Sequence, residues 1–207
     1  MLKLYYCRLP DRTPAVPAER LSAYRREKLE KQKNEQARLR SLTAELLLRY
    51  SLNDGGFSVD GPLDIGVGEQ GKPFLRDGRC FFSLSHSADM VLCALCDREI
   101  GADIQIASKA NDALIRRFFA EDERDFICSA QDPDAAFSEI WTEKESYCKM
   151  DGRGLALPLG SFSVFDPRIA ALLWHMTAGE YHLALCTDML NTDRPEPIEV
   201  RTGVLFQ

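Results

Sequence analysis

Three apolar stretches lie close together in the middle of the chain. They run from Cys80 to Leu84, from Val91 to Cys96 and from Ile100 to Ile106. Short apolar runs separated by polar turn residues are typical of β-strands in a protein core. The sequence therefore predicts a β-sheet here, and the remaining segments have to form elements that cover it.

Helical patterns precede and follow these strands. From Arg20 to Tyr50, apolar residues recur mainly at helical spacing with charges between them, so we expect two helices or one kinked helix. Asp132 followed by Pro133 is an N-cap and first-turn signal for a later helix. The predicted helices are thus 20–50, 112–119, 121–129 and 133–150, and the further predicted strands are 3–9, 65–67, 161–165, 170–176 and 181–187.

Each half of the chain combines helices with antiparallel strands. The sequence therefore predicts an α+β fold of two related subdomains that meet near residue 103. We place the N-terminal subdomain at 1–102 and the C-terminal one at 103–204. Residues 205–207 end a TGVLFQ segment that resembles the remnant of a protease-cleavable tag, although a native segment fits equally well.

The charge balance limits the kinds of partner. The chain has 26 basic and 32 acidic residues, for a formal charge of -6, so a general attraction to nucleic acid is not expected. Any anion site must therefore be local. The N-terminus lacks a secretory signal and no apolar run is long enough to span a membrane, so we expect a soluble cytoplasmic protein.

Seven cysteines are scattered through predicted strands and helices, which predicts reduced thiols rather than a disulfide framework. Cys93 and Cys96 form a CxxC motif, which in other settings marks redox or metal chemistry. Here the motif lies within an apolar run, and no second CxxC or nearby Cys/His pair completes a zinc site. Two core cysteines are the favoured interpretation, and we interpret His175 and His182 as structural too.

One predicted helix carries a polar face of mixed chemistry. Trp141, Glu145 and Lys149 are spaced by four and lie on one side of it. An ordinary surface ion pair is the default interpretation of a glutamate and a lysine at this spacing. The adjoining tryptophan favours a second interpretation, because a partly buried carboxylate needs a partner or a metal ion.

Two strand segments add further candidates. In FSLSHS, residues 82–87, small hydroxyl residues surround His86, and such a strand end can place hydroxyl, imidazole and backbone N–H groups around a phosphate. A turn histidine without a function is equally common. In GADIQ, residues 101–105, Asp103 interrupts an apolar strand, which is costly unless the acid pairs with a cation or binds a metal.

The order of these segments resembles a known family. Gly71-Lys72-Pro73, FSLSHS, GADIQ and the segment from Phe137 to Lys149, followed by a glycine-rich turn, occur in this order along the chain. The sequence is thus similar to the Sfp-type 4′-phosphopantetheinyl transferases, whose signature runs GKP, FNxSHS, GxDxE and FxxxWxxKExxxK. The resemblance covers almost the whole chain. It implies an intramolecular pseudodimer of two similar α+β subdomains.

The resemblance also implies a reaction. Enzymes of this family transfer the 4′-phosphopantetheine arm of coenzyme A to a serine of an apo acyl or peptidyl carrier protein, and release adenosine 3′,5′-bisphosphate. Mg²⁺ assists, and Mn²⁺ is an alternative ion. The expected partners are therefore coenzyme A and a carrier protein, with no nucleic acid and no membrane, and the protein is expected to be a monomer.

Roles for single residues follow from the same resemblance. Asp103 and Glu145 match the metal-binding acids, and Glu145 also matches the base for the acceptor serine. The remaining matches are His86 for the pyrophosphate, Lys149 for the phosphates and the leaving oxygen, Lys144 in the same KE motif, Lys72 and Ser85 for coenzyme A, and Arg25, Lys28 and Arg40 for its 3′-phosphate. A solvated helix face is the alternative explanation of the basic segment 25–33.

One residue departs from the family pattern. Gln105 stands where the family often has a second acid. A glutamine oxygen or a water can fill that position, because Mg²⁺ commonly keeps several waters and takes only one or two carboxylates. We therefore include Gln105 as a metal ligand, directly or through water. The departure also supports an alternative function, a catalytically weak coenzyme A-binding protein with a regulatory or scaffolding role.

Overall fold

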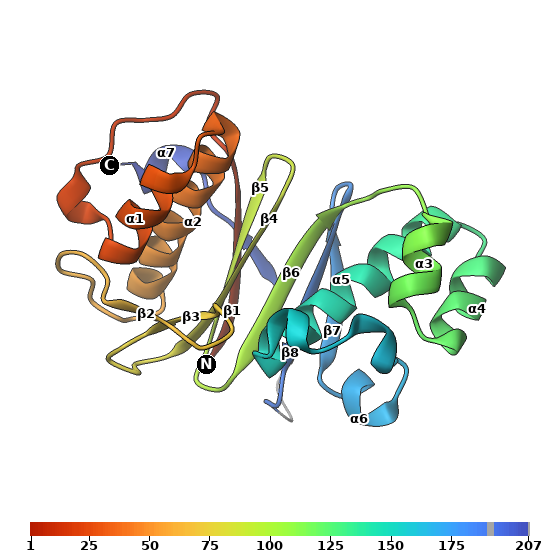
Figure 1. The fold of residues 1–207 in the computed structure, drawn as a ribbon. Helices are drawn as coiled ribbons and strands as arrows, with labels where there is room; N and C mark the ends of the chain where they lie inside the picture. Colours follow the sequence, from red (N-terminus) through yellow and green to blue (C-terminus); the bar gives the residue numbers. More distant parts are fainter. Residues whose placement is uncertain (190–192, 207) are drawn as a thin grey trace.

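The computed structural model describes residues 1–189 and 193–206 and contains two main β-sheets (Figure 1). In the first sheet the strand order is β4-β5-β1-β9, and in the second it is β6-β8-β7, while β2 and β3 form a separate hairpin. The strands are β1 (Leu2–Arg8), β2 (Ile65–Val67), β3 (Pro73–Leu75), β4 (Phe81–Ser87), β5 (Met90–Cys96), β6 (Ile100–Ile106), β7 (Leu173–Ala178), β8 (Tyr181–Thr187) and β9 (Pro197–Glu199). The fold is mixed α+β.

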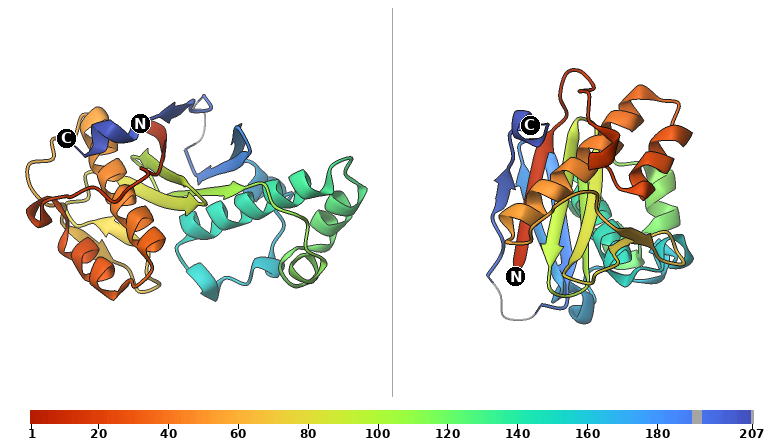
Figure 2. Two further views of the ribbon diagram at one scale, coloured as in Figure 1. Left: turned by 90° about the horizontal axis from the view of Figure 1, so that it is seen from above. Right: turned by 90° about the vertical axis from the view of Figure 1, so that its left-hand side faces the viewer.

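Helices cover the outer face of the first sheet. Besides a 3₁₀ turn, Ala18–Arg20, these are α1 (Ala23–Lys31), α2 (Glu35–Asp54) and α7 (Thr202–Leu205). Asn34 starts α2, because its side chain accepts a hydrogen bond from the Ala37 N–H at 2.9 Å. The leucines of α2 then pack with β1, β4 and β5 in one core, to which Leu205 also belongs. Figure 2 shows α7, near the C-terminus, beside α2.

Helix α5 (Pro133–Asp151) covers the second sheet. Asp132 caps its first turn by accepting the Ala135 N–H at 3.0 Å, and Gly152 ends it with a positive φ of 82°. The other helices of this half are α3 (Asp112–Phe118), α4 (Glu121–Ser129) and α6 (Pro167–Ala170), with 3₁₀ turns at Gly154–Ala156 and Leu159–Ser161. From above, α3 and α4 lie at the end of the molecule opposite α1 and α2 (Figure 2).

The two sheets share a core. Leu4 and the β5 residues Met90 and Leu92 contact Ile104 of β6 and Leu183 of β8 in one buried cluster. The two cysteines of the CxxC motif belong to opposite faces of β5: Cys93 is buried in the core under α2 and Cys96 in the core between the sheets. Both are free thiols, as are the other five, which confirms the prediction of core cysteines. Because apolar contacts join the two halves, residues from both halves lie along the seam between them.

Most of the predicted elements are confirmed. The 20–50 segment forms two helices rather than one kinked helix, and the helices predicted at 112–119, 121–129 and 133–150 are α3, α4 and α5. The prediction of a strand at 161–165 is wrong. Residue 161 ends a 3₁₀ turn, and the backbone of Phe162 and Val164 binds the side chains of Lys144 and Glu123 instead of a neighbouring strand.

Other elements were missed or displaced. The predicted strand at 170–176 begins later, as β7, after the short helix α6. Strands β3 and β9 were not predicted, and β9 pairs in parallel with β1, so the chain returns to the first sheet after completing the second. In the part of the chain that the structure describes, no helix combines the length and apolar character of a membrane span.

Candidate functional site

A cavity of about 430 Å³ lies where α1, β4, β6 and α5 meet. Its walls come from both halves of the molecule. Eight of the residues that the sequence singled out line it: Arg25, Lys28, Ser85, His86, Asp103, Gln105, Glu145 and Lys149. Trp141, on the same face of α5 as Glu145 and Lys149, lines it as well. We call this space the polar cavity.

Gly101 allows α5 to lie against β6. A Cβ atom at this position would lie 1.9 Å from the backbone oxygen of Ser146 and 2.3 Å from the backbone nitrogen of Met150. Any larger residue would push the helix away from the strand. Because the helix backbone approaches so closely, Asp103, two residues further along β6, comes within reach of the α5 side chains.

Asp103 binds one residue from each of two neighbouring elements, α5 and β4. Its Oδ1 accepts a hydrogen bond from Lys149 Nζ of α5 at 2.6 Å and one from Ser85 Oγ of β4 at 2.6 Å. The acid that interrupts an apolar strand is therefore paired, as its burial requires. Lys149 forms its ion pair with Asp103 and not with Glu145, so the surface ion pair expected from the helical spacing is not what the structure shows.

Glu145 faces the same space as Asp103. Burial raises the pKa of its carboxyl, the nearby negative charge of Asp103 raises it further, and Lys149 partly opposes both. Two carboxyl groups that line one cavity, one of them with a raised pKa, suit a divalent cation. The described residues contain no group of three or more His, Cys, Asp or Glu side chains that could hold a metal ion. Mg²⁺ needs only one or two carboxylates besides waters and substrate phosphates, so Asp103 and Glu145 suffice to hold it, with Gln105 on the wall beside them.

His86 lies among positive charges. Burial lowers the pKa of its imidazole, and the charges of Arg40, Lys149 and Lys28 lower it further. A neutral imidazole surrounded by three cations can donate a hydrogen bond to an anion without adding to their repulsion. This side of the polar cavity therefore suits a phosphate group, although the protein as a whole is acidic.

The other residues predicted to contact coenzyme A differ in their hydrogen bonds within the protein and in whether they line the polar cavity. Arg25 is buried and already uses two donors, Nε to Glu45 at 3.2 Å and Nη1 to Ser41 Oγ at 2.7 Å. Arg40 and Lys72 do not line the polar cavity. Arg40 donates to the carbonyl oxygen of Ala88 at 2.8 Å. Their roles in binding coenzyme A, and those of the other predicted site residues, stay predictions.

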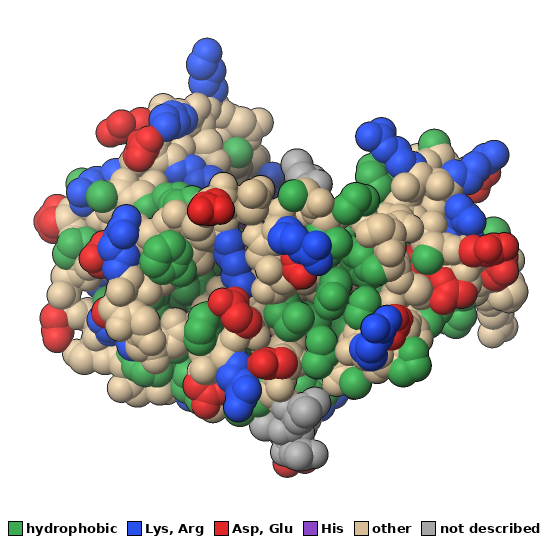
Figure 3. All heavy atoms as spheres, turned by 60° about the horizontal axis from the view of Figure 1, so that its bottom comes forward, with side chains coloured by type: hydrophobic (Ala, Val, Ile, Leu, Met, Phe, Trp, Pro, Cys, Tyr) green, Lys and Arg blue, Asp and Glu red, His purple; other side chains and the backbone are tan. Residues whose placement is uncertain are grey.

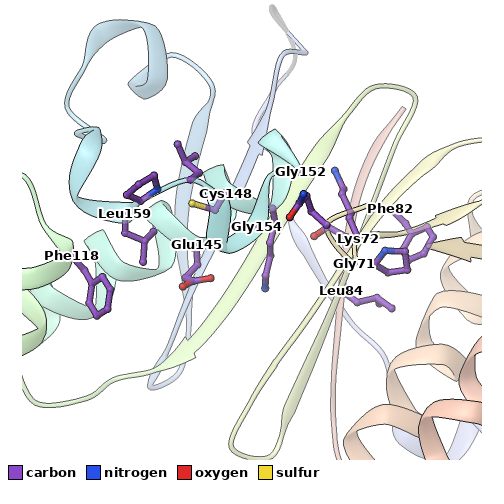
Figure 4. A pocket seen from close by; sticks show the side chains of 16 residues that line it. Gly71, Lys72, Phe82, Leu84, Phe118, Glu145, Cys148, Gly152, Gly154 and Leu159 are labelled. Atoms are coloured by element: carbon purple, nitrogen blue, oxygen red, sulfur yellow. The ribbon is translucent and has the colours of Figure 1, made fainter. Parts of the chain in front are cut away.

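Lys72 lines a second cavity of about 400 Å³ that adjoins the first (Figure 4). We call it the apolar cavity, because its walls include Phe82, Leu84, Phe118, Cys148, Leu157 and Leu159. Glu145 and Lys149 line both cavities, and in Figure 4 the Glu145 carboxyl group lies between Phe118 on one wall and Leu84 on the other. Figure 3 shows hydrophobic side chains on the surface between the two halves of the molecule.

Sequence reasoning missed three polar residues of the polar cavity. Tyr24 and Gln32 belong to the α1 region, and Ser41 holds Arg25 from α2. The acceptor Oε1 of Gln32 is buried without a hydrogen-bond partner among the described residues. No motif marked these residues, since a tyrosine, a glutamine and a serine on charged amphipathic helices are ordinary surface residues.

Comparison with known proteins identifies the family. The family model described as the 4′-phosphopantetheinyl transferase superfamily matches residues 99–197. The chain is 34% identical over 154 residues to a 4′-phosphopantetheinyl transferase of Bacillus subtilis, which covers 70% of this chain. The chain belongs to this superfamily. The match to residues 99–197 contains Asp103, Glu145 and Lys149, so it includes the α5 wall of both cavities.

Other members of the superfamily are similar to the chain as well. The 4′-phosphopantetheinyl transferase gsp of Aneurinibacillus migulanus is 37% identical over 125 residues, 59% of this chain and 52% of the relative. The L-aminoadipate-semialdehyde dehydrogenase-phosphopantetheinyl transferase of Saccharomyces cerevisiae is 28% identical over 176 residues, 70% of this chain. The matches span 66% of the Bacillus subtilis relative and 65% of the yeast one, just under two thirds of their length.

Proposed function

We propose that the protein transfers the 4′-phosphopantetheine arm of coenzyme A to a serine of an apo acyl or peptidyl carrier protein, releasing adenosine 3′,5′-bisphosphate. The observation that carries the proposal is that Asp103, Glu145, His86 and Lys149 line one cavity. Two acids and two groups that bind phosphate thereby converge from three different elements. Membership of the superfamily supports the same reaction.

The two cavities match the two ends of coenzyme A. The diphosphate suits the polar cavity, where His86, Lys28 and Lys149 lie, and Arg25 and Arg40 supply further positive charge for the 3′-phosphate. The pantetheine arm has apolar segments and suits the apolar cavity beside Glu145. A substrate in this orientation has its diphosphate at the junction of the two cavities, next to both acids.

The residues at the junction divide the work. Glu145, whose raised pKa makes it a better proton acceptor than an ordinary glutamate, takes the proton of the carrier serine. The serine oxygen bonds to the β-phosphorus as the bond from that phosphorus to the bridging oxygen breaks. Lys149 and His86 stabilise the charge on the departing phosphate, and Lys149 can donate a proton to it. A divalent ion, Mg²⁺ or Mn²⁺, held by Asp103, Glu145 and Gln105, would neutralise diphosphate charge when bound.

The arrangement of the halves supports a monomeric enzyme. Each half has a sheet with helices on one face, and their seam forms the walls of the polar cavity, so a single chain supplies both sides. We propose that the halves are the two subdomains of an intramolecular pseudodimer. Seven free cysteines fit a reducing compartment, and we place the protein in the cytoplasm.

Intact mass spectrometry of carrier proteins tests the proposal. Several apo acyl and peptidyl carrier proteins, each incubated with the protein, coenzyme A and Mg²⁺, should gain the mass of one phosphopantetheine. Glu145→Gln should lower the rate by roughly 10²-fold or more, because it removes the base. Binding of coenzyme A with no mass gain on any carrier would favour the regulatory or scaffolding alternative, and near-normal transfer by Glu145→Gln would remove that residue as base.

A further inference from the structure

Strands β4 and β6 lie side by side but belong to different sheets. No backbone hydrogen bond joins them among the residues that the structure describes. Instead, the Ala102 N–H donates to Ser83 Oγ at 2.9 Å, and the Ile106 N–H donates to Ser87 Oγ at 3.1 Å. Serine hydroxyls thus take the place of carbonyl groups in joining the strands.

The spacing of these contacts is regular. Ser83 and Ser87 are four residues apart on β4, and their partners Ala102 and Ile106 are four residues apart on β6. The strands therefore run parallel with a constant register, although they lack a backbone ladder. Between the two contacts, Ser85 reaches Asp103 Oδ1 at 2.6 Å. The alternate side chains of β4 all face the same edge of β6.

The register of β6 against β4 determines where the side chains of the polar cavity lie relative to one another. His86 and Ser85 come from β4, and Asp103 comes from β6. The apolar core between the sheets holds the halves together, but apolar contacts are not directional and tolerate small displacements. Hydrogen bonds have narrow limits of distance and angle. The buried hydroxyls of Ser83 and Ser87, on either side of the Ser85–Asp103 hydrogen bond, tie the backbone of β6 to β4 at two points.

We propose that Ser83 and Ser87 are positioning residues for the transfer reaction. They set the register of β6 against β4, and through it the alignment of the diphosphate side of the site with the acidic side. The inference rests on the proposed function, since it assigns a use to that alignment. Neither residue lines the polar cavity. Ser83 does lie on the wall of the apolar cavity, but its hydroxyl is bound to the backbone of Ala102, and Ser87 lines neither cavity.

The proposal predicts a loss of coupling between two ligands. Coenzyme A should bind more tightly when a divalent ion is present, because the ion and the diphosphate share one site. In Ser83→Ala/Ser87→Ala, coenzyme A alone should bind with near-normal affinity, because His86 and Lys28 stay in place. The tightening caused by Mn²⁺ should fall by about tenfold, which corresponds to about 1.4 kcal/mol. The transfer rate should fall with KM for coenzyme A changed less than kcat.

Titration calorimetry of coenzyme A with and without Mn²⁺ measures the coupling. Ser83→Thr/Ser87→Thr keeps both hydroxyls on residues that favour strands, and should restore most of it. Ser51→Ala is the matched structural control, because Ser51 is buried in α2, where its hydroxyl donates to the Leu47 carbonyl and contacts Cys93 of β5 but neither β6 nor either cavity, and it should lower stability without changing the coupling. If the double alanine variant does not fold, Ser87→Ala alone serves, with a smaller loss expected.

The outcomes separate the inference from the proposed function. Unchanged Mn²⁺ coupling in a folded serine-to-alanine variant would overturn the positioning role and leave the transferase assignment intact. An equal loss of coupling in Ser51→Ala would overturn it too, since general destabilisation would then explain the effect. A wild-type protein that binds coenzyme A without any Mn²⁺ coupling would overturn the shared site, and the inference with it.

Discussion

Helix α5 carries two lysines that bind carboxylates from other elements, and the two ion pairs differ in how closed they are. Lys144 Nζ donates to both carboxylate oxygens of Glu123, at 2.8 and 2.7 Å, and to the Phe162 carbonyl oxygen at 2.7 Å. Both side chains of this pair are fully buried. Lys149 Nζ, in contrast, makes one hydrogen bond to Asp103, and its side chain keeps 30% exposure.

The difference follows from position on the helix. Five residues correspond to about 140° of rotation, so the two lysines point to different neighbours. Lys144 points toward α4 and the 162–164 segment, where Glu123 also accepts the N–H groups of Ala120 and Val164 at 2.8 Å each. Lys149 points toward β6 and lines both cavities.

The comparison shows that Lys144 and Lys149, two lysines of one motif, have different roles. An ammonium group has three donors. In Lys144 all three are used within the protein, so this lysine holds α5 against α4 and leaves nothing for a substrate. In Lys149 only one is used among the residues that the structure describes, so the others can reach a phosphate. The structure thus separates a lysine that builds the site from one that can act in it.

The largest expected effect on stability comes from breaking the buried ion pair between Lys144 and Glu123, which we call the closed pair. Lys144→Met leaves the Glu123 carboxylate buried without its counterion, and should lower the free energy of unfolding by about 3–5 kcal/mol. Urea denaturation followed by circular dichroism measures the change. Lys144→Met/Glu123→Leu should recover much of the loss, because no charge is then buried. A loss below about 1 kcal/mol in the single variant would show that the pair is not closed to solvent.

Lys149→Met should show the opposite balance. Its transfer rate should fall by roughly 10²-fold, because a donor to the phosphates is lost. Stability should fall less than in Lys144→Met, because solvent reaches Lys149 and Ser85 still donates to Asp103. Lys149→Arg keeps the charge but not the compact ammonium, and should be intermediate. Carrier modification followed by mass spectrometry gives the rate, and thermal unfolding gives the stability. A variant with normal transfer but strongly reduced stability would reverse the distinction between the two lysines.

The same contacts explain what the sequence could and could not predict. Helical spacing placed Glu145 and Lys149 on one face, and the structure confirms this, because the spacing is a local property of α5. The partner of Lys149 could not be predicted from that pattern. Asp103 is 46 residues away and reaches Lys149 only because Gly101 lets the helix approach β6.

The wrong strand at 161–165 has a related cause. Phe162 and Val164 alternate with polar residues, which is the pattern of a half-buried strand. Their backbone groups are instead satisfied by the closed pair, through Lys144 and Glu123. A buried side chain from a distant helix had replaced the strand partner, and no local pattern reveals that. Strand β9 was missed for a simpler reason, since three residues that include a proline at the edge of a sheet have no strand pattern.

A third acid, Glu143 of α5, sharpens the comparison, because it has no ion-pair partner among the described residues. Burial, followed by the charges of Glu139 and Glu123, raises the pKa of Glu143 from its ordinary value of 4.5 to about 7. The folded state therefore holds a proton that the unfolded state releases, and this contribution to stability is lost as pH rises from 4.5 to 7.

Glu143→Gln should remove this dependence on pH. At pH 8 it should raise the free energy of unfolding by about 1 kcal/mol, because solvent reaches part of the side chain and screens its charge. At pH 4.5 the change should be close to zero, since the native carboxyl is protonated there. Thermal unfolding of both proteins across this range measures the difference. Glu139→Gln, which removes the second cause of the raised pKa, should give a smaller gain with the same sign. An equal effect of Glu143→Gln at both pH values would mean that Glu143 is ionised throughout, and that a carboxyl on this face of α5 needs no lysine to stay charged.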